Sequence, residues 1–219
     1  MSQGKSAMED LLEIMAKLRS PEGCPWDREQ DHKSLKFHAV EEVYELMDSI
    51  EAEDDVEMLE ELGDLLLQVV FHCQLAKERG VFDFEDAARR ISEKLIRRHP
   101  HVFENTVVDS VDAVWTQWEQ IKKAEKAGTP HERQSVFDGI PKHLPALLSA
   151  EKTIKKAVKS GMMEPMAPNH DSPTSDAMGL QLFKLVQLAY SRGWSAEDLL
   201  RQETRKQELN WRKKESNHE

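Results

Sequence analysis

The carboxylates at 41–45 are the first residues in this 219-residue sequence whose types and spacing could perform chemistry. Glu41, Glu42 and Glu45 lie in a stretch where apolar residues recur at helical spacing: Val40, Val43, Tyr44, Met47 and Ile50. At about 100° per residue, the three carboxylates share an arc of about 100° on the side opposite that apolar face. Like charges at this spacing repel one another and mildly destabilise an isolated helix. Taken alone, the group favours a solvated acidic face.

A second acidic group, Glu61 and Asp64, lies in a stretch that the sequence predicts to be a buried helix. From 62 to 73 apolar residues occur on nearly every side of the helix. A single polar stripe crosses it at steps of three and four residues: Glu57, Glu61, Asp64, Gln68 and His72. An ionised carboxylate in a buried position needs a cation or a hydrogen-bond partner. The stripe therefore indicates a binding site for a cation or for a hydrogen-bonding partner.

Pairing the two helices would bring four or five carboxylates together without an equal number of Lys or Arg residues. Oxygen ligands of this kind suit a hard divalent cation, Mg²⁺ above all, with Mn²⁺ as a possible substitute. Mg²⁺ held by carboxylates usually serves a substrate phosphate. A zinc role for His32 or His38 is not expected, because neither has a second His or a Cys at metal-ligand spacing.

Glu-Glu-x-x-Glu at 41–45 followed by Glu-x-x-Asp at 61–64 resembles the signature of the MazG family, the all-α nucleoside triphosphate pyrophosphohydrolases. Four further stretches resemble the same family: CPWD at 24–27, RRHPHVF at 97–103, WEQIK at 118–122 and PALL at 145–148. The resemblance is close from about Met8 to Val158 and partial afterwards. It implies an all-α helical bundle with a four-helix core.

The resemblance also implies an activity: Mg²⁺-dependent hydrolysis between the α- and β-phosphates, giving a nucleoside monophosphate and pyrophosphate. The expected Mg²⁺ ligands are Glu42, Glu45, Glu61 and Asp64, each pair three residues apart and so on one helical face. Glu41 could orient a ligand or act as the general base, and the sequence does not separate these roles.

Positive charges for the substrate phosphates occur in a predicted helix at 84–98. Lys94 and Arg98 lie one turn apart on one face, as a phosphate clamp requires, and Arg97 adds a further charge. The metal site predicted nearby favours the clamp over a solvated face. The family resemblance implies that Lys94, Arg98, Trp118 and Lys122 contact the nucleotide.

Trp26 lies in a predicted loop at 19–31, where Pro21, Gly23 and Pro25 disfavour a helix. Its indole could face a substrate base or could plug the end of the helix bundle. Both interpretations remain open.

The elements expected from periodicity are helices at 7–19, 34–52, 55–78, 84–98, 112–127 and 145–160. Asp54-Asp55 is expected to form a short turn that caps the third of these helices, and Gly80 is expected to end it. The fourth is expected to turn Ala87, Ala88, Ile91 and Leu95 inward. We expect a MazG-like catalytic domain at 7–127 and a connecting helix with a flexible linker at 128–176.

Residues 177–219 are expected to be the degenerate remnant of a second copy of that domain. QLAKERG at 74–80 is echoed by QLAYSRG at 187–193, Glu85-Asp86 by Glu197-Asp198, and Lys94 by Lys206. The linker at 161–176 stands where a second Glu-Glu-x-x-Glu helix belongs, and AMGL at 177–180 replaces Glu-x-x-Asp. Asn210 stands in place of Arg98. Metal chemistry therefore belongs to the first copy.

The composition limits the class of partner. The net charge is −11, from 41 acidic and 30 basic residues, which argues against a nucleic-acid binder. The two cysteines, Cys24 and Cys73, favour a reduced compartment. No signal-like segment occurs, and no apolar run approaches the roughly 20 residues that span a bilayer. We expect a cytoplasmic protein without a membrane partner. Since one four-helix unit leaves the site open on one side, we also expect a homodimer or higher homo-oligomer.

The sequence is also compared with what three other classes of protein would require. A catalytically weak nucleotide-binding regulatory module would keep the fold and the metal, and the eroded second copy supports it. A di-iron bundle requires Glu-x-x-His pairs, which the two acidic groups lack. A purely structural helical protein is disfavoured by the polar stripe through a helix expected to be buried.

Overall fold

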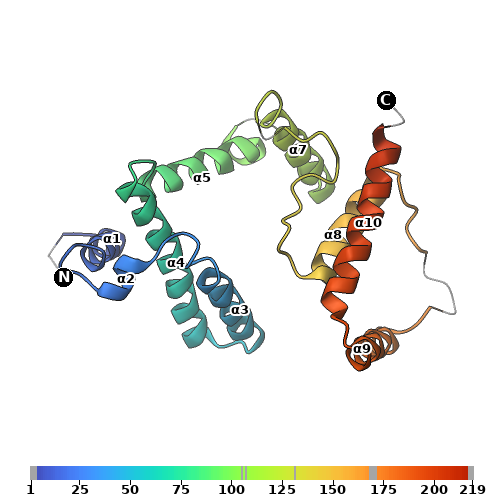
Figure 1. Cartoon of the computed structure of the whole chain (residues 1–219). Coiled ribbons are helices and arrows are strands. Elements are labelled where there is room, and N and C mark those ends of the chain that lie inside the picture. Colours follow the sequence, from blue (N-terminus) through green and yellow to red (C-terminus); the bar gives the residue numbers. More distant parts are fainter. Residues whose placement is uncertain (1–3, 105, 107, 131, 168–171, 217–219) are drawn as a thin grey trace. The chain divides into compact units, whose positions relative to one another are not determined.

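The computed structural model describes residues 4–104, 106, 108–130, 132–167 and 172–216, and within them every regular element is a helix (Figure 1). The all-α class predicted from the sequence is confirmed. The helices are α1 (Ala7–Leu18), α2 (Pro25–Glu29), α3 (His38–Glu51), α4 (Asp55–Glu78), α5 (Phe84–Arg98), α6 (Pro100–Phe103), α7 (Val111–Ala124), α8 (Ala146–Lys159), α9 (Ser175–Ser191) and α10 (Ala196–Ser216).

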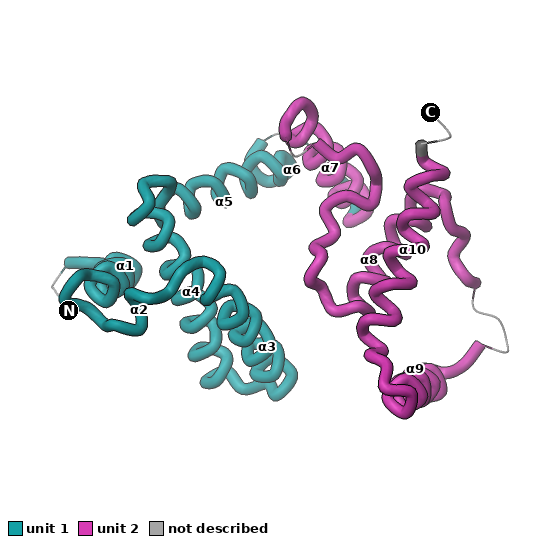
Figure 2. The backbone as a smooth tube through the Cα atoms, in the orientation of Figure 1, with its two compact units in different colours: residues 1–110 teal, residues 111–219 magenta. Residues whose placement is uncertain are grey.

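The chain forms two compact units, Met1–Ser110 and Val111–Glu219 (Figure 2). Residues 111–127 were expected in the first domain, but they belong to the second unit.

The core of the first unit lies between α1 and the C-terminal half of α4. Its fully buried side chains are Met15, Leu35, Val70, Phe71 and Leu75. At the edge of this core, the Arg19 guanidinium donates two hydrogen bonds to the Glu78 carboxylate, at 2.8 and 2.7 Å. These bonds lower the pKa of Glu78 and tie the end of α1 to the end of α4.

Helices α3 and α4 form a hairpin and lie side by side in Figure 1. Only residues 52–54 connect them, so the helices must run antiparallel. The connection turns at Glu53, which has φ +55°, and the Asp54 side chain then accepts hydrogen bonds from the N–H groups of Val56 and Glu57. The predicted cap at Asp54 is confirmed, and it fixes where α4 begins.

The apolar faces of this hairpin differ from the prediction. The expected burial of 62–73 holds for Val70, Phe71 and Cys73, whereas Leu62 and Val69 are 48% and 45% exposed. The apolar face of α3 is also exposed, because α3 turns its acidic side toward α4; its residues are Val40, Val43, Tyr44, Met47 and Ile50. Ile91 and Leu95, expected inward on α5, are each 46% exposed. The described part of the first unit thus leaves these faces uncovered.

Two short helices that were not predicted from the sequence begin at prolines. The predicted loop at 19–31 contains α2, with Pro25 in its first turn, and Pro100 both follows α5 and begins α6. Proline fits the first helical turn because its missing N–H would have no intrahelical partner there. Conversely, α3 begins at His38 rather than at 34, because the Asp31 side chain accepts hydrogen bonds from the N–H groups of Lys33 and Ser34 and holds a turn.

The second unit is built on the packing of α8 against α10. Phe137, in the loop before α8, is 1% exposed and stacks on Trp211 of α10 with ring centroids 5.7 Å apart. Arg212 of α10 pairs with Asp138 at 2.8 Å. The loop at 134–146 is thus held in place by α10. The expected linker at 161–176 contains no helix before Ser175 among its described residues, and 168–171 lie outside them.

The corner that follows α4 recurs after α9. Gly80 has φ +68° and Gly193 has φ +69°. After each glycine, the next N–H donates to the carbonyl five residues before it, at 3.0 Å and 2.9 Å respectively. Asp83 and Ser195 then cap the following helix, each accepting from the N–H three residues on at 3.1 Å. The sequence echo between 74–80 and 187–193 therefore corresponds to the same local structure, a helix end that favours glycine.

Among the described residues, no helix is both long and apolar enough to cross a membrane.

Candidate metal and substrate site

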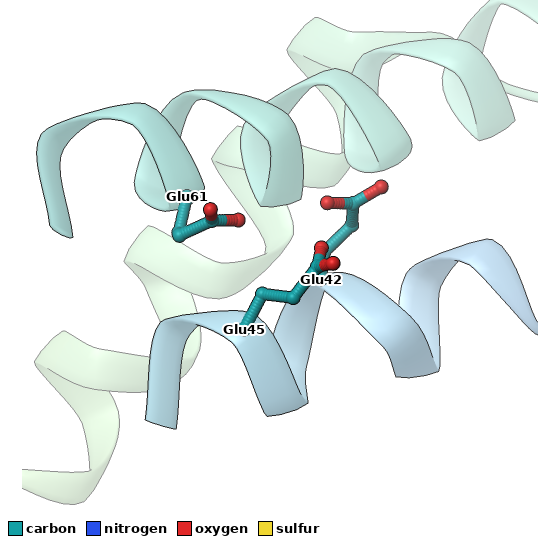
Figure 3. A group of neighbouring side chains, drawn as sticks. All are labelled: Glu42, Glu45 and Glu61. Carbon is teal, nitrogen blue, oxygen red and sulfur yellow. The ribbon is translucent and has the colours of Figure 1, made fainter. Parts of the chain in front are cut away.

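Three carboxylates from the two helices of the hairpin meet in one place (Figure 3). Glu42 and Glu45 lie one turn apart on α3, and Glu61 faces them from α4. One carboxylate oxygen from each lies within 4.8 Å of the other two. The hairpin thus brings together Glu42, Glu45 and Glu61, which the sequence predicted as ligands of one metal.

The electrostatics of this group are those of an uncompensated acidic cluster. Burial raises the pKa of Glu42, and the charges of Asp64 and Glu45 raise it further. The pKa of Glu61 is also raised, by burial and then by the charges of Glu45, Asp64 and Glu42. Both shifts mean that the ionised forms are disfavoured where they stand.

A divalent cation fits this arrangement. One oxygen of Glu61, Oε2, is buried and accepts no hydrogen bond from the residues that the structure describes. A buried carboxylate oxygen without a donor is costly, and a cation would supply the missing positive partner. Carboxylates from two helices are the oxygen ligands that Mg²⁺ and Mn²⁺ accept.

The other two predicted catalytic carboxylates lie beside the group. Asp64, one turn after Glu61 on α4, is half-buried and outside the set that meets within 4.8 Å, although its charge acts on both Glu42 and Glu61. Glu41 is exposed and has a His38 ring nitrogen 3.7 Å from its carboxylate. Glu41 therefore borders the group without joining it.

The predicted phosphate clamp lies on α5. Lys94 and Arg98 are half-buried and Arg97 is exposed. The helix packs on α4, but the largest charge effects on the pKa values of Glu42 and Glu61 come from other carboxylates.

Trp26 is 53% exposed on α2, and its ring meets the edge of the His38 ring with centroids 6.1 Å apart. An indole exposed to this degree does not plug the end of the first unit. Its predicted contact with a substrate base remains a prediction.

Trp118 and Lys122 lie on α7 in the second unit. The Lys122 ammonium is 3.1 Å from the carboxylate of Glu119 and 5.2 Å from the centre of the Trp118 ring. Trp115 packs edge-on against Trp118, with ring centroids 5.6 Å apart. These contacts give Trp118 and Lys122 a fixed local arrangement, and their role toward a nucleotide remains a prediction.

Two features of the polar stripe on α4 were not expected. The Gln68 side chain is buried, and its Nε2 donates to Glu42 Oε1 at 3.4 Å. One turn later, His72 stacks on His32, with their Nδ1 atoms 2.9 Å apart. The stripe itself was visible in the sequence, but a contact with a residue on another element depends on how the hairpin and the loop before it pack.

Comparisons with known proteins point to one family. The family model of the MazG nucleotide pyrophosphohydrolase domain matches residues 30–103. The chain is 40% identical to the nucleoside triphosphate pyrophosphohydrolase/pyrophosphatase MazG of Thermotoga maritima, over 94% of this chain and 84% of that protein. It is 46% identical to the nucleoside triphosphate pyrophosphohydrolase of Escherichia coli K12, over 70% of this chain and 58% of that one.

A solved structure of a MazG-related protein from Thermotoga maritima is 28% identical, with a TM-score of 0.45, and the match covers 52% of this chain and 98% of that one. The matched residues 30–103 contain all three carboxylates that meet between α3 and α4. Together with the identity to the first of these relatives over most of both chains, this places the protein plainly: the chain belongs to the MazG family of nucleotide pyrophosphohydrolases.

Proposed function

We propose that this protein hydrolyses nucleoside triphosphates between the α- and β-phosphates in a Mg²⁺-dependent reaction. The observation that carries the proposal is the meeting of Glu42, Glu45 and Glu61 within 4.8 Å, with the pKa values of Glu42 and Glu61 raised and one Glu61 oxygen unpartnered among the described residues. The names of the family and of the relatives support a nucleoside triphosphate as the substrate.

In the proposed reaction, water attacks the α-phosphorus and the bond to the bridging oxygen breaks. The products are a nucleoside monophosphate and pyrophosphate, and one proton is released. Glu42, Glu45 and Glu61 would hold Mg²⁺, with Asp64 as a fourth ligand, and Mn²⁺ could replace it. When bound, the cation supplies positive charge to the phosphate oxygens and acidifies the attacking water.

We assign the substrate's phosphates to Lys94, Arg97 and Arg98 on α5. Of these, Lys94 and Arg98 would stabilise the charge that develops on the leaving pyrophosphate. Trp118 and Lys122 would contact the nucleotide, and Trp26 would face its base. Glu41, exposed beside Glu42, has two candidate roles: it orients Glu42, or it accepts the proton of the attacking water.

We further propose a homodimer or higher homo-oligomer that covers the apolar faces of α3 and α4. These faces include Tyr44 and Met47 on α3, 49% and 48% exposed, and Val56 and Leu59 on α4, 76% and 74% exposed. Contiguous apolar surfaces of this kind commonly mark interfaces. A nucleoside triphosphate substrate also fits a cytoplasmic protein.

The test is the release of pyrophosphate from a panel of nucleoside triphosphates, with and without Mg²⁺, by wild type and by Glu61→Ala. We expect pyrophosphate and monophosphate from wild type only, and only with Mg²⁺. Orthophosphate as the direct product would contradict the assigned bond. Mg²⁺-dependent nucleotide binding without any product would instead identify a regulatory module.

A further inference from the structure

Gln68 is a polar residue in the most apolar part of α4. Gln68 is 8% exposed, and its neighbours along the helix include the buried Val70 and Phe71. A Leu or Met at this position would bury more apolar surface and would leave no amide to satisfy. Packing alone therefore does not account for a glutamine here.

The amide of Gln68 is hydrogen-bonded to the acidic group. Nε2 donates to Glu42 Oε1 at 3.4 Å, a long bond, and it lowers the pKa of that carboxyl against the larger effects that raise it. The other end of the amide, Oε1, is buried and accepts no hydrogen bond from the described residues. One end thus holds a predicted metal ligand, and the other is ready for a donor that the described chain does not supply.

Glu42 needs such a partner because of where it lies. One oxygen of Glu45 and one of Glu61 lie within 4.8 Å of a Glu42 oxygen, and the Gln68 amide on α4 donates a hydrogen bond to Glu42. A neutral donor can stabilise the carboxylate without adding a charge that would compete with a bound cation.

We propose that Gln68 is a positioning residue of the metal site, whose amide holds the Glu42 carboxylate in the orientation that a divalent cation requires. The inference rests on the proposed function, because it requires Glu42 to be a metal ligand. Oε1 would then accept a hydrogen bond from water or from a hydroxyl group that enters the site with the cation and the substrate.

The test compares Gln68→Met with Gln74→Met. Methionine keeps the length of the side chain and removes both ends of the amide. Gln74 lies on the same helix and donates to Glu78 at 3.0 Å, outside the acidic group, so it is a matched control. The readout is Mn²⁺ binding followed by electron paramagnetic resonance, together with the melting temperature of each metal-free protein and the Mg²⁺ concentration that gives half-maximal turnover.

We expect Gln68→Met to weaken Mn²⁺ binding about tenfold and to raise the half-activating Mg²⁺ concentration by a similar factor, since residues that orient metal ligands contribute on this scale. Turnover should recover at high Mg²⁺, the metal-free melting temperature should hold or rise, and Gln74→Met should bind Mn²⁺ like wild type. Unchanged Mn²⁺ affinity in Gln68→Met with a lower melting temperature would overturn the inference and leave Gln68 a packing residue. If wild type bound no Mn²⁺, or if Glu61→Gln bound it as well as wild type, the metal site itself would be overturned.

Discussion

At the scale of single residues, the acidic group combines repulsion with an unsatisfied oxygen. Glu42, Glu45 and Glu61 each place a carboxylate oxygen within 4.8 Å of the other two, and burial together with the neighbouring negative charges raises the pKa values of Glu42 and Glu61. Residues at functional sites commonly carry such shifts, because the site is arranged for a ligand and not for its own stability.

Glu61→Gln tests this balance directly. Removing the charge of Glu61 relieves the repulsion, so we expect the metal-free variant to melt at a higher temperature than metal-free wild type. Wild type should gain stability from Mg²⁺, by about 2.7 kcal/mol at a hundredfold excess over the dissociation constant, and the variant should gain far less. Differential scanning calorimetry with EDTA or Mg²⁺ measures both effects. A Mg²⁺ response in Glu61→Gln equal to that of wild type would contradict the assignment of Glu61 as a ligand.

The same residues predict opposite pH trends with and without metal. Glu42 and Glu61 have pKa values above the usual 4.5 when folded, so the folded state binds more protons than the unfolded state just above that pH. Their contribution to the stability of the metal-free protein is therefore fully present below pH 4.5 and is lost as the pH rises through the raised values. Mg²⁺ binding requires the ionised forms, so its stabilisation should grow over the same range.

The test measures melting temperatures across this pH range for wild type and for the Glu42→Gln/Glu61→Gln double variant. The difference in melting temperature between the two proteins reports on these two residues, and it should change with pH in opposite directions in EDTA and in Mg²⁺. Parallel curves in both conditions would contradict the raised pKa values.

At the scale of elements, the hairpin shows what the sequence could predict. The spacing of Glu42 and Glu45, and the position of Glu61 on the next helix, were sufficient to predict that these three carboxylates lie together, and a cap at the start of α4 was also predictable. The contact between Gln68 and Glu42 was not, because it depends on the packing angle of two helices. The sequence did not predict helix α2, because proline disfavours a helix everywhere except in its first turn, which is where Pro25 lies.

The exposed faces were misjudged for a different physical reason. Periodicity identifies which residues share a face, but it does not say whether that face is covered by the same chain. Val43 and Met47 share the predicted apolar face of α3, yet they are 41% and 48% exposed. The face that packs on α4 carries Glu42 and the buried Ser49 instead.

The repeated corner predicts a pair of equivalent glycine effects. Gly80→Ala and Gly193→Ala should each destabilise the protein by about 1 kcal/mol, because alanine disfavours the left-handed conformation that both positions require. Neither added methyl group would meet a neighbouring atom, so the effect isolates the backbone. Urea unfolding measures it.

Gly179→Ala is the matched control, since Gly179 lies inside α9 and a methyl group there also meets no atom. In a helix interior, alanine is favoured over glycine by about 0.5–1 kcal/mol, so this variant should be more stable than wild type. Destabilisation of all three variants by similar amounts would contradict the backbone explanation.

At the scale of the whole molecule, the uncovered faces of α3 and α4 predict self-association. Val43→Asp should shift the protein toward the monomer in sedimentation velocity, because the partner copy would have to bury a charge. Tyr190→Asp is a control, since Tyr190 is 85% exposed on α9 of the second unit. An unchanged sedimentation coefficient for Val43→Asp across concentrations would contradict an interface on α3.

The corner after α4 and its repeat after α9 also bear on how the chain folds. Each is closed by a hydrogen bond between residues only five apart, and each is followed by a cap that spans three residues. Loops this short close in well under a microsecond, and contacts this local do not wait for distant parts of the chain. The acidic group, by contrast, joins residues up to 19 positions apart on two different helices. We therefore expect both corners to form early, and the three carboxylates to come together later, once α3 and α4 pack against each other.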